Sequence, residues 1–293
     1  MHRYRRYAYA FIGPAVLIIA VTLVYPMAQG GWLSFMRVAI DLSTTFVGLA
    51  NYERILDQPI FWQSIGHTGL FAIVSTVATL AVGLGFALLL DRPDLRLRTF
   101  WRVLFIMPWT ISHVAAGLGW KWIFDTLYGV ANDLLLRLHL IAEPLVWLGT
   151  RDLAMACLIV ANVWRSYPFI MLLLLAALQT IPREQYEAAD VDGATTWQRF
   201  RHVTMPNLKF AIFVGTALDF IFNVRQFDLI YVMTRGGPRN STEVLATLVN
   251  RQAFEYFDYG DAAATSVLML FMLVAATWIY RRAMRSPLES QGA

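Results

Sequence analysis

Six long apolar runs limit what this chain can fold into more than any other feature of its sequence. They cover residues 8–28, 66–90, 103–124, 154–178, 210–231 and 262–280. Each run has at least 19 residues, long enough for a helix to cross the roughly 30 Å hydrocarbon core of a bilayer. Backbone polar groups must be satisfied within each segment in lipid, so each run predicts a transmembrane α-helix. The sequence therefore predicts an all-α, polytopic membrane protein with six transmembrane helices and a single domain, residues 1–293.

The composition agrees with a membrane protein and argues against a soluble one. Hydrophobic residues make up 58% of the chain and charged residues only 15%, whereas soluble domains carry about 25% charged residues. The net charge of +4 arises from basic residues that lie between the apolar runs rather than in one patch. We therefore expect membrane lipid around the chain and no nucleic-acid partner.

The basic residues also predict the orientation in the membrane. The first run follows Arg3, Arg5 and Arg6 and is longer than the apolar part of a signal peptide, so we expect it to remain as a span. With the N-terminus inside, 14 Lys and Arg residues fall in cytoplasmic segments and 7 on the opposite side. This excess predicts a multi-pass protein of the cytoplasmic (inner) membrane with both termini in the cytoplasm.

One further segment could add a seventh span. Residues 129–148 are rich in leucine, but Asp133, Arg137, His139 and Glu143 interrupt them. Four polar groups are costly in hydrocarbon, so we predict an amphipathic helix on the outer face instead. Four glycines within the spans are expected to let helices approach closely: Gly83, Gly85, Gly117 and Gly119. We predict a role in helix packing for them and no chemical role.

Motifs for catalysis and metal binding are missing from the sequence. Neither Lys121 nor Lys209 follows a glycine, so no phosphate-binding loop G-x-x-x-x-G-K-[ST] exists. The patterns H-E-x-x-H and G-x-S-x-G are also absent, no histidines share helical spacing, and Cys157 is the only cysteine. We expect no enzyme activity, no metal site and no cofactor in this chain, so any ATP hydrolysis must come from another protein.

The predicted cytoplasmic loop 182–206 has a regular pattern. Pro182 and Glu184 fit the first turn of a helix, and Gly193 fits a bend between two short helices. One apolar stripe contains Tyr186, Ala189, Gly193, Trp197 and Phe200. A stripe of this kind is common in solvated loops and does not by itself name a partner.

The order of residues in the loop is more specific. The sequence Glu187-Ala188-Ala189-x-x-Asp192-Gly193-Ala194, followed by Phe200 and Pro206, resembles the E-A-A…G loop of ABC-importer permeases. The resemblance implies a pair of short coupling helices that dock in a cleft of a cytoplasmic ATPase. The predicted ATPase-coupling residues are Glu187, Ala188, Ala189, Asp192, Gly193, Ala194, Phe200 and Pro206.

A second set of motifs narrows the resemblance. Phe227-Asp228-x-Ile230-Tyr231, Gly236-Gly237-Pro238 and Tyr259-Gly260-x-Ala262-x-Ala264-x-Ser266 are similar to the larger permease of carbohydrate importers of the maltose, trehalose and glycerol-3-phosphate type. The similarity is strongest over residues 162–266. It implies a bacterial, type I ABC-importer permease fold. The implied partners are a second homologous permease subunit, a cytoplasmic ATPase dimer that binds ATP and magnesium, and an extracytoplasmic substrate-binding protein.

Polar residues inside the spans are candidates for a substrate pathway. Asp219, Asn223 and Gln226 share one helical face and could line a hydrated cavity, although helix–helix hydrogen bonds would also explain them. The other candidates are Asn162, Arg165, Ser166, Thr265 and Ser266. A buried arginine needs a partner or water, and Asp219 is the hypothetical partner of Arg165. Arg225 and Asp228, three residues apart, predict a structural ion pair.

These features together predict a transmembrane permease subunit of an ATP-driven importer. The predicted cargo is a carbohydrate, either a di- or oligosaccharide or a related polyol or phosphodiester, and the chain would form half of an alternating-access pathway. The alternative is an ion-gradient-driven secondary transporter, which needs a carboxylate relay and for which Asp219 is a thin basis. A membrane scaffold would explain the spans but not the ordered loop.

Overall fold

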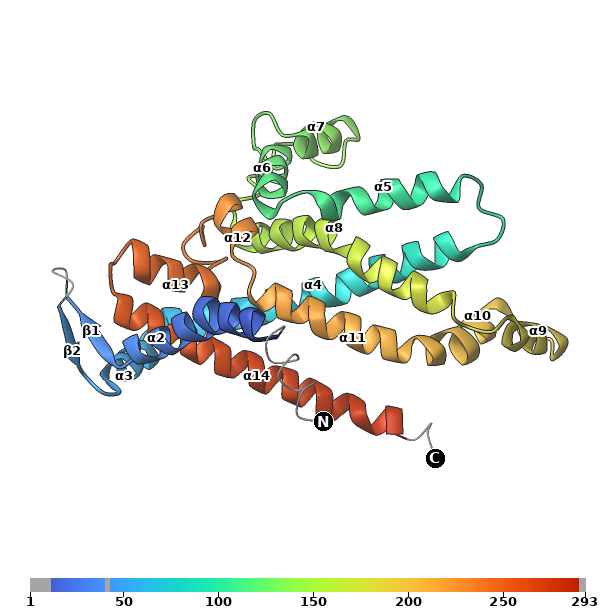
Figure 1. Ribbon diagram of the computed structural model, residues 1–293. Helices are drawn as coiled ribbons and strands as arrows, with labels where there is room; N and C mark the ends of the chain where they lie inside the picture. Colours follow the sequence, from blue (N-terminus) through green and yellow to red (C-terminus); the bar gives the residue numbers. More distant parts are fainter. Residues whose placement is uncertain (1–11, 40–42, 290–293) are drawn as a thin grey trace, which may run out of the picture. The chain divides into compact units, whose positions relative to one another are not determined.

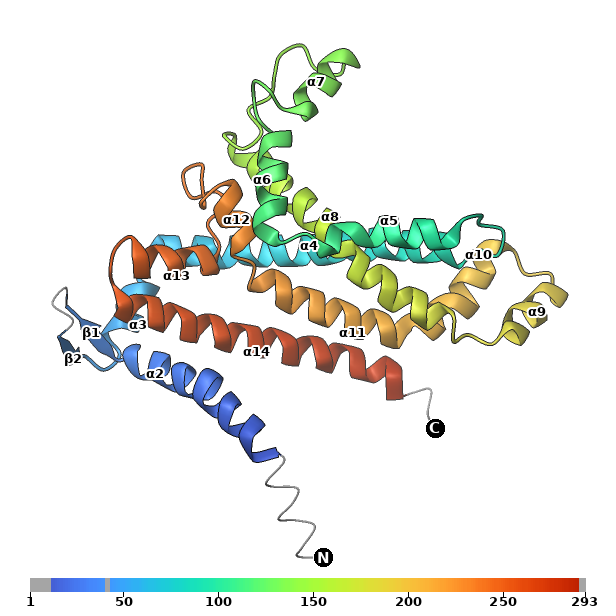
Figure 2. The same ribbon diagram turned by 45° about the horizontal axis from the view of Figure 1, so that its top comes forward.

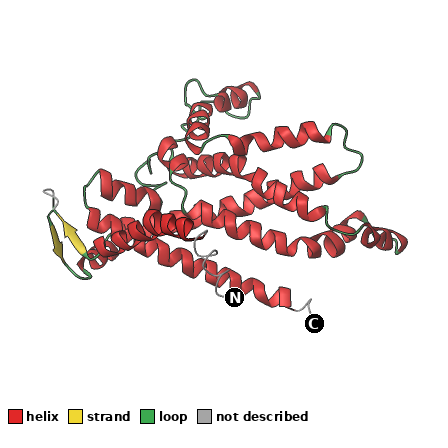
Figure 3. Cartoon of the chain, viewed as in Figure 1, coloured by secondary structure: helices red, strands yellow, loops and turns green. Residues whose placement is uncertain are grey.

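The computed structural model describes residues 12–39 and 43–289, with side chains up to residue 282. Helices dominate this part of the chain, and its only sheet is a short hairpin (Figure 3). Strands β1 (Met36–Val38) and β2 (Thr44–Phe46) pair antiparallel, with Met36 opposite Phe46. The predicted all-α class is therefore confirmed, with one small hairpin added.

The described chain divides into two compact units. One contains the residues up to Trp62 together with Leu248–Met272, and the other contains Gln63–Thr247 together with the residues from Leu273 onward. The first unit includes η1 (Ala20–Val24), α2 (Tyr25–Leu33), the hairpin and α3 (Ala50–Leu56). The prediction of one domain over residues 1–293 stays a prediction.

The second unit holds most of the helices, which Figure 1 labels along the chain. They are α4 (Pro59–Asp91), α5 (Arg98–Thr110), α6 (His113–Ile123), α7 (Val130–Arg137), α8 (Arg151–Leu178), α9 (Arg183–Val191), α10 (Thr196–Arg199), η2 (Phe200–Thr204), α11 (Met205–Val224) and α12 (Asp228–Met233). Helices α13 (Leu245–Phe254) and α14 (Tyr259–Glu289) belong to both units, as α4 does.

Five described helices are long and apolar enough to cross a membrane, and a sixth span is formed if one bent pair is counted together. The unbroken helices are Ile12–Leu33, Pro59–Asp91, Arg151–Leu178, Thr196–Val224 and Tyr259–Arg282. Each overlaps one of the apolar runs, and residues 8–11 of the first run lie outside the described residues. The number of candidate spans thus agrees with the sequence prediction, but two of the predicted spans are not single continuous helices.

The third predicted span, 103–124, is not one helix. Helices α5 and α6 meet at 96°, and Figure 2 shows α6 turned away from the line of α5. Pro108 removes a backbone donor near the end of α5. Ser112 then starts a new helix, because its hydroxyl accepts a hydrogen bond from the backbone N–H of Ala115 at 3.2 Å.

The fifth predicted span, 210–231, is also wrong at its C-terminal end. Helix α11 ends at Val224, and Arg225 has left the helical conformation. Helix α12 starts at Asp228 and buries Leu229, Ile230 and Met233 against a core that α6 and α8 share. Burial of these three apolar side chains explains why the chain turns where its hydropathy continues.

The segment 129–148 is helical only at its start. Helix α7 carries an ion pair between Arg137 and Asp133 at 2.9 Å, and His139 then adopts a left-handed backbone conformation. The remainder is a loop held by the side chain of Asn132, which hydrogen bonds both the backbone N–H and the carbonyl of Leu145 and accepts from the indole of Trp147. The predicted amphipathic helix is therefore shorter than expected.

Only two of the four glycines predicted to permit close packing do so. A Cβ at Gly83 in α4 would lie 2.9 Å from the Cβ of Ile170 in α8, and one at Gly117 in α6 would lie 3.2 Å from the side chain of Val232. A Cβ at Gly85 or Gly119 would meet no atom within 4 Å. Gly83 thus marks the close crossing of α4 and α8, which buries Ala87, Leu90 and Leu174 nearby.

Candidate functional site

The loop between α8 and α11 forms two short helices, as the sequence predicted. Helix α9 ends at Val191, and Gly193 follows with a φ of +74°, in the left-handed region that favours glycine. Helix α10 then starts with a capping box, in which Thr195 and Gln198 each hydrogen bond the other's backbone N–H. Asp190 and Arg199 join the two helices through an ion pair of 2.6 Å. The bend at Gly193 also interrupts the apolar stripe expected from the sequence.

The predicted coupling residues differ in exposure. Glu187, Ala188, Asp192 and Gly193 are exposed, whereas Ala189, Ala194, Phe200 and Pro206 are half-buried. Val191 and Trp197 are apolar but exposed, with 88% and 66% of their surface open to solvent. Where α9 packs against η2, the hydroxyl groups of Tyr186 and Thr204 lie 3.0 Å apart and form a hydrogen bond. The loop therefore presents a formed surface of acidic, small and apolar side chains.

A buried polar network connects α4, α8 and α11 in the second unit. The amide of Asn223 is at its centre, because it donates to Asp219 Oδ2 at 2.9 Å and to Thr76 Oγ1 at 3.0 Å. The amide of Asn162 donates to Asn223 Oδ1 at 2.8 Å. Asn162, Asp219 and Asn223 are all at most 4% exposed. Hydrogen bonding between helices, the alternative considered for these residues, is therefore present.

The same network forms one wall of a cavity of about 390 Å³. Six of the eight predicted substrate-pathway residues line it: Asn162, Arg165, Ser166, Asp219, Asn223 and Gln226. Thr265 and Ser266 belong to the other unit. There, Ser266 donates back to the carbonyl of Ala262 at 2.8 Å, and Thr265 is fully buried. The structure thus gathers most of the candidates at one place, while their role in transport stays a prediction.

Two predicted charge pairs are not formed. The Nε of Arg165 donates to the carbonyl of Ile111 at 3.1 Å, and no ion pair joins Arg165 to Asp219 in the part of the chain that the structure describes. Arg225 follows the end of α11 while Asp228 starts α12. Because they are not on one helix, the three-residue spacing no longer brings them together, and the described residues show no ion pair between them.

Five residues of the cavity escaped the sequence reasoning. Trp109 and His113 flank the break between α5 and α6, whereas Phe169, Phe222 and Phe227 come from α8, α11 and the turn after it. The proline at 108 and the polar pair Ser112-His113 inside an apolar run were the available signals of a break. The aromatic side chains carried no signal of their own among so many apolar neighbours.

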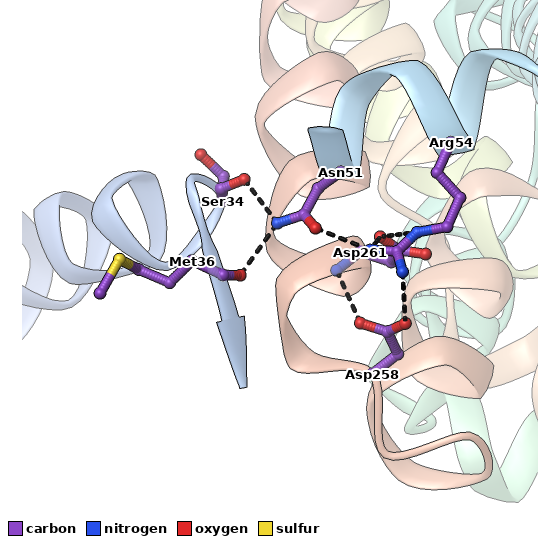
Figure 4. Close-up of polar contacts among 6 residues, drawn as sticks. All are labelled: Ser34, Met36, Asn51, Arg54, Asp258 and Asp261. Atoms are coloured by element: carbon purple, nitrogen blue, oxygen red, sulfur yellow. Dashed lines mark hydrogen bonds and ion pairs between the residues drawn. The ribbon is translucent and has the colours of Figure 1, made fainter. Parts of the chain in front are cut away.

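A second polar cluster lies in the first unit (Figure 4). Asn51 of α3 donates to the backbone carbonyls of Ser34 and Met36, both at 2.9 Å. Gly260 fits closely beside them, because a Cβ there would lie 2.4 Å from the carbonyl oxygen of Met36. This contact gives a physical reason for the glycine of the Tyr259-Gly260 motif.

Comparison with known proteins gives consistent results. Residues 80–285 match the family described as binding-protein-dependent transport system inner membrane component. The sulfoquinovosyl glycerol transport system permease protein of Agrobacterium fabrum is 35% identical, covering 96% of this chain and 91% of its own length. The trehalose/maltose transport system permease protein of Thermococcus litoralis is 36% identical, covering 95% of this chain and 94% of its own length.

A similar fold occurs among solved structures. A chain from the crystal structure of a bacterial ABC transporter involved in the import of the acidic polysaccharide alginate aligns with a TM-score of 0.85 and 20% identity. The alignment covers 97% of this chain and 96% of that one. At this identity the match shows the fold alone. It agrees with the type I permease fold that the sequence predicted.

Proposed function

This chain belongs to the family of inner membrane components of binding-protein-dependent transport systems, and we propose that it is the permease subunit of an ATP-driven importer for a carbohydrate. The family match over residues 80–285 carries the proposal. Relatives that cover more than nine-tenths of the chain are named for sulfoquinovosyl glycerol and for trehalose and maltose. A di- or oligosaccharide, or a related glycosyl compound, is the substrate class that these names support.

The exposed loop of α9 and α10 supports docking to an ATPase. Glu187 and Asp192 offer charge, Ala188 and Gly193 allow close approach, and Trp197 offers apolar surface. In this proposal the loop lies in the cytoplasm with both termini, and a separate ATPase dimer binds ATP and magnesium. A second, homologous permease completes the pathway, and an extracytoplasmic binding protein delivers the substrate.

The cavity beside α11 supports a place for the sugar. Its volume of about 390 Å³ falls within the range of roughly 300–1,000 Å³ found for small-molecule sites. Amide, hydroxyl and aromatic side chains line it together, which suits a ligand with polar edges and apolar faces. The residues proposed to contact substrate are Asn162, Arg165, Ser166, Asp219, Asn223 and Gln226.

The ion-gradient alternative has little support. Asp219 was its only basis, and this carboxylate is 2% exposed and bound to the amide of Asn223 rather than to a chain of titratable groups. In addition, no cluster of three or more His, Cys, Asp or Glu side chains able to hold a metal ion occurs among the described residues. Neither observation favours coupling to a proton or ion.

Mutation of the loop tests the proposed function. In a reconstituted complex, Gly193→Val should place a β-branched residue in a left-handed conformation and distort the bend. Glu187→Ala should remove the exposed charge. We expect each change to reduce substrate-dependent ATP hydrolysis and uptake at least tenfold, and to weaken co-purification of the ATPase, while membrane insertion is kept.

Two matched variants serve as controls. Gly193→Asn should keep most activity, because asparagine tolerates the left-handed region, and Glu184→Gln changes an exposed acid in the first turn of α9. Wild-type transport and normal ATPase co-purification in both Gly193→Val and Glu187→Ala would refute the coupling role. A panel of sugars, polyols and phosphodiesters, scored by binding-protein-dependent ATP hydrolysis, tests the substrate class.

A further inference from the structure

Arg165 is a charged residue in a membrane-spanning helix whose charge is not neutralised by the described protein. Its Nε donates to the carbonyl of Ile111, an acceptor left free where α5 ends. Its other N–H groups have no acceptor among the described residues, and no described carboxylate lies within 4.0 Å of it. A guanidinium in a span is energetically costly unless it is paired or hydrated. The break at Ile111 therefore fixes the side chain in the cavity while leaving its fork of donors available.

Gln226 also lines the cavity. It is only 8% exposed, and its Nε2 has no hydrogen-bond acceptor among the described residues. This nitrogen has almost no accessible surface, so it lies beneath the wall of the cavity rather than in its open space. Arg165 is therefore the better placed of the two donors for a ligand in the cavity.

The other charged groups around the cavity do not neutralise Arg165. Asp219 is 2% exposed and faces the amide of Asn223, so its carboxylate is engaged away from the open space. Asp228 is exposed at the N-terminus of α12, where the helix dipole stabilises a negative charge. Arg225 and His113 also line the cavity and add basic groups. The lining therefore carries two arginines and two aspartates, and no described carboxylate lies within 4.0 Å of Arg165.

Aromatic side chains add an apolar surface to the same cavity. The rings of Trp109 and Phe169 have centroids 6.2 Å apart, and those of Phe169 and Phe222 are 6.3 Å apart in an edge-to-face arrangement. Together they provide an apolar surface next to the guanidinium of Arg165. The apolar C–H face of a pyranose ring suits such a surface, whereas an inorganic anion would make no use of it.

We propose that this cavity binds a glycosyl unit that carries an acidic group, with the Arg165 guanidinium holding a carboxylate, sulfonate or sulfate. A planar guanidinium matches such oxyanions with two parallel hydrogen bonds. The inference rests on the proposed carbohydrate permease function and narrows its substrate class to acidic sugars.

Direct binding to the assembled permease–ATPase complex tests this inference without the selectivity of the binding protein. The complex is placed in nanodiscs of phosphatidylcholine, and calorimetry compares methyl glucoside with methyl glucuronide and methyl glucoside 6-sulfate. The two acidic ligands should bind at least tenfold more tightly than the neutral one. This preference should fall at least tenfold in Arg165→Gln, partly recover in Arg165→Lys, and stay unchanged in Arg137→Gln, which alters an exposed arginine of α7.

Several outcomes would overturn the inference. The inference is wrong if the three sugars bind equally, if only the neutral sugar binds, or if no sugar binds. Loss of acidic-sugar binding when phosphatidylglycerol is added would assign the site to a lipid headgroup instead. If the Arg165→Gln complex fails to assemble, the preference of the wild-type complex for acidic over neutral sugars and the binding by Arg165→Lys still test the inference. Binding-protein-dependent ATP hydrolysis with neutral sugars in the same complex would leave the proposed function standing, whereas no response to any carbohydrate would refute that function itself.

Discussion

The Nη2 of Arg54 lies 2.7 Å from Oδ1 of Asp261, and the Nε of the same guanidinium donates to that oxygen at 3.2 Å (Figure 4). The same Nη2 also donates to Asn51 Oδ1 at 2.7 Å. The Asp261 side chain is only 5% exposed, whereas that of Arg54 is 35% exposed. This pair fastens α3 to the first turn of α14, and through Asn51 it also fastens the segment that leads into the hairpin.

Removal of the arginine should therefore destabilise the first unit. In Arg54→Ala, the Asp261 carboxylate stays buried without its donors, at a cost of roughly 1–3 kcal/mol. The thermal unfolding temperature of the purified permease should fall, and the exchange Arg54→Asp with Asp261→Arg should recover part of the loss. Arg37→Ala, which changes an exposed side chain of β1, is the control. An unchanged unfolding temperature in Arg54→Ala would contradict this account.

The two glycines of α4 provide a matched pair for helix packing. Gly83→Ala should disturb the crossing of α4 and α8, because the new Cβ would lie 2.9 Å from Ile170 and 3.1 Å from the backbone nitrogen of Met171. Gly85→Ala should be tolerated, because its Cβ meets nothing within 4 Å. Folded yield after detergent extraction and thermal stability measure the difference. Equal behaviour of the two variants would show that the close crossing does not limit stability.

The network around Asn223 should depend on its central amide. Asn223→Leu keeps the volume but removes the amide that bonds Asp219, Thr76 and Asn162, and the buried amide of Asn162 loses its acceptor. We expect a loss of about 1–3 kcal/mol in stability, together with reduced transport. Ser166→Ala alters the same cavity outside this network and should leave stability unchanged. Differential scanning fluorimetry of both variants, with ATP hydrolysis in parallel, makes the comparison.

The start of α6 should depend on its cap. Ser112→Ala removes the hydroxyl that accepts from Ala115 and should cost roughly 0.5–2 kcal/mol. Ser112→Asp keeps an acceptor at the N-terminus and should restore most of that stability. Chemical cross-linking between cysteines placed on α5 and α6 would report whether the bend persists. A stable, fully active Ser112→Ala protein would show that packing alone holds the bend.

The loop of residues 182–206 shows how much of the local structure the sequence predicted. Pro182, the glutamates and Gly193 are local signals, and the two short helices form where these residues predicted them. The breaks near Ile111 and Arg225 were missed, because hydropathy continues across both. Their causes are a proline with a new cap in the first case and burial of α12 in the second.

The sequence by itself determined the membrane class, the number of spans, the two short helices of loop 182–206 and the family resemblance, because each depends on residues that are near one another along the chain. Only the tertiary structure decided which polar groups meet. Asn162 and Asn223 are far apart in sequence yet hydrogen bonded, and Arg165 contacts Ile111 rather than Asp219. The same holds for Arg54 and Asp261, whose pairing depends on how α3 packs against the start of α14. Spacing along one helix predicts a shared face, but the partner across that face is chosen by the packing of other helices.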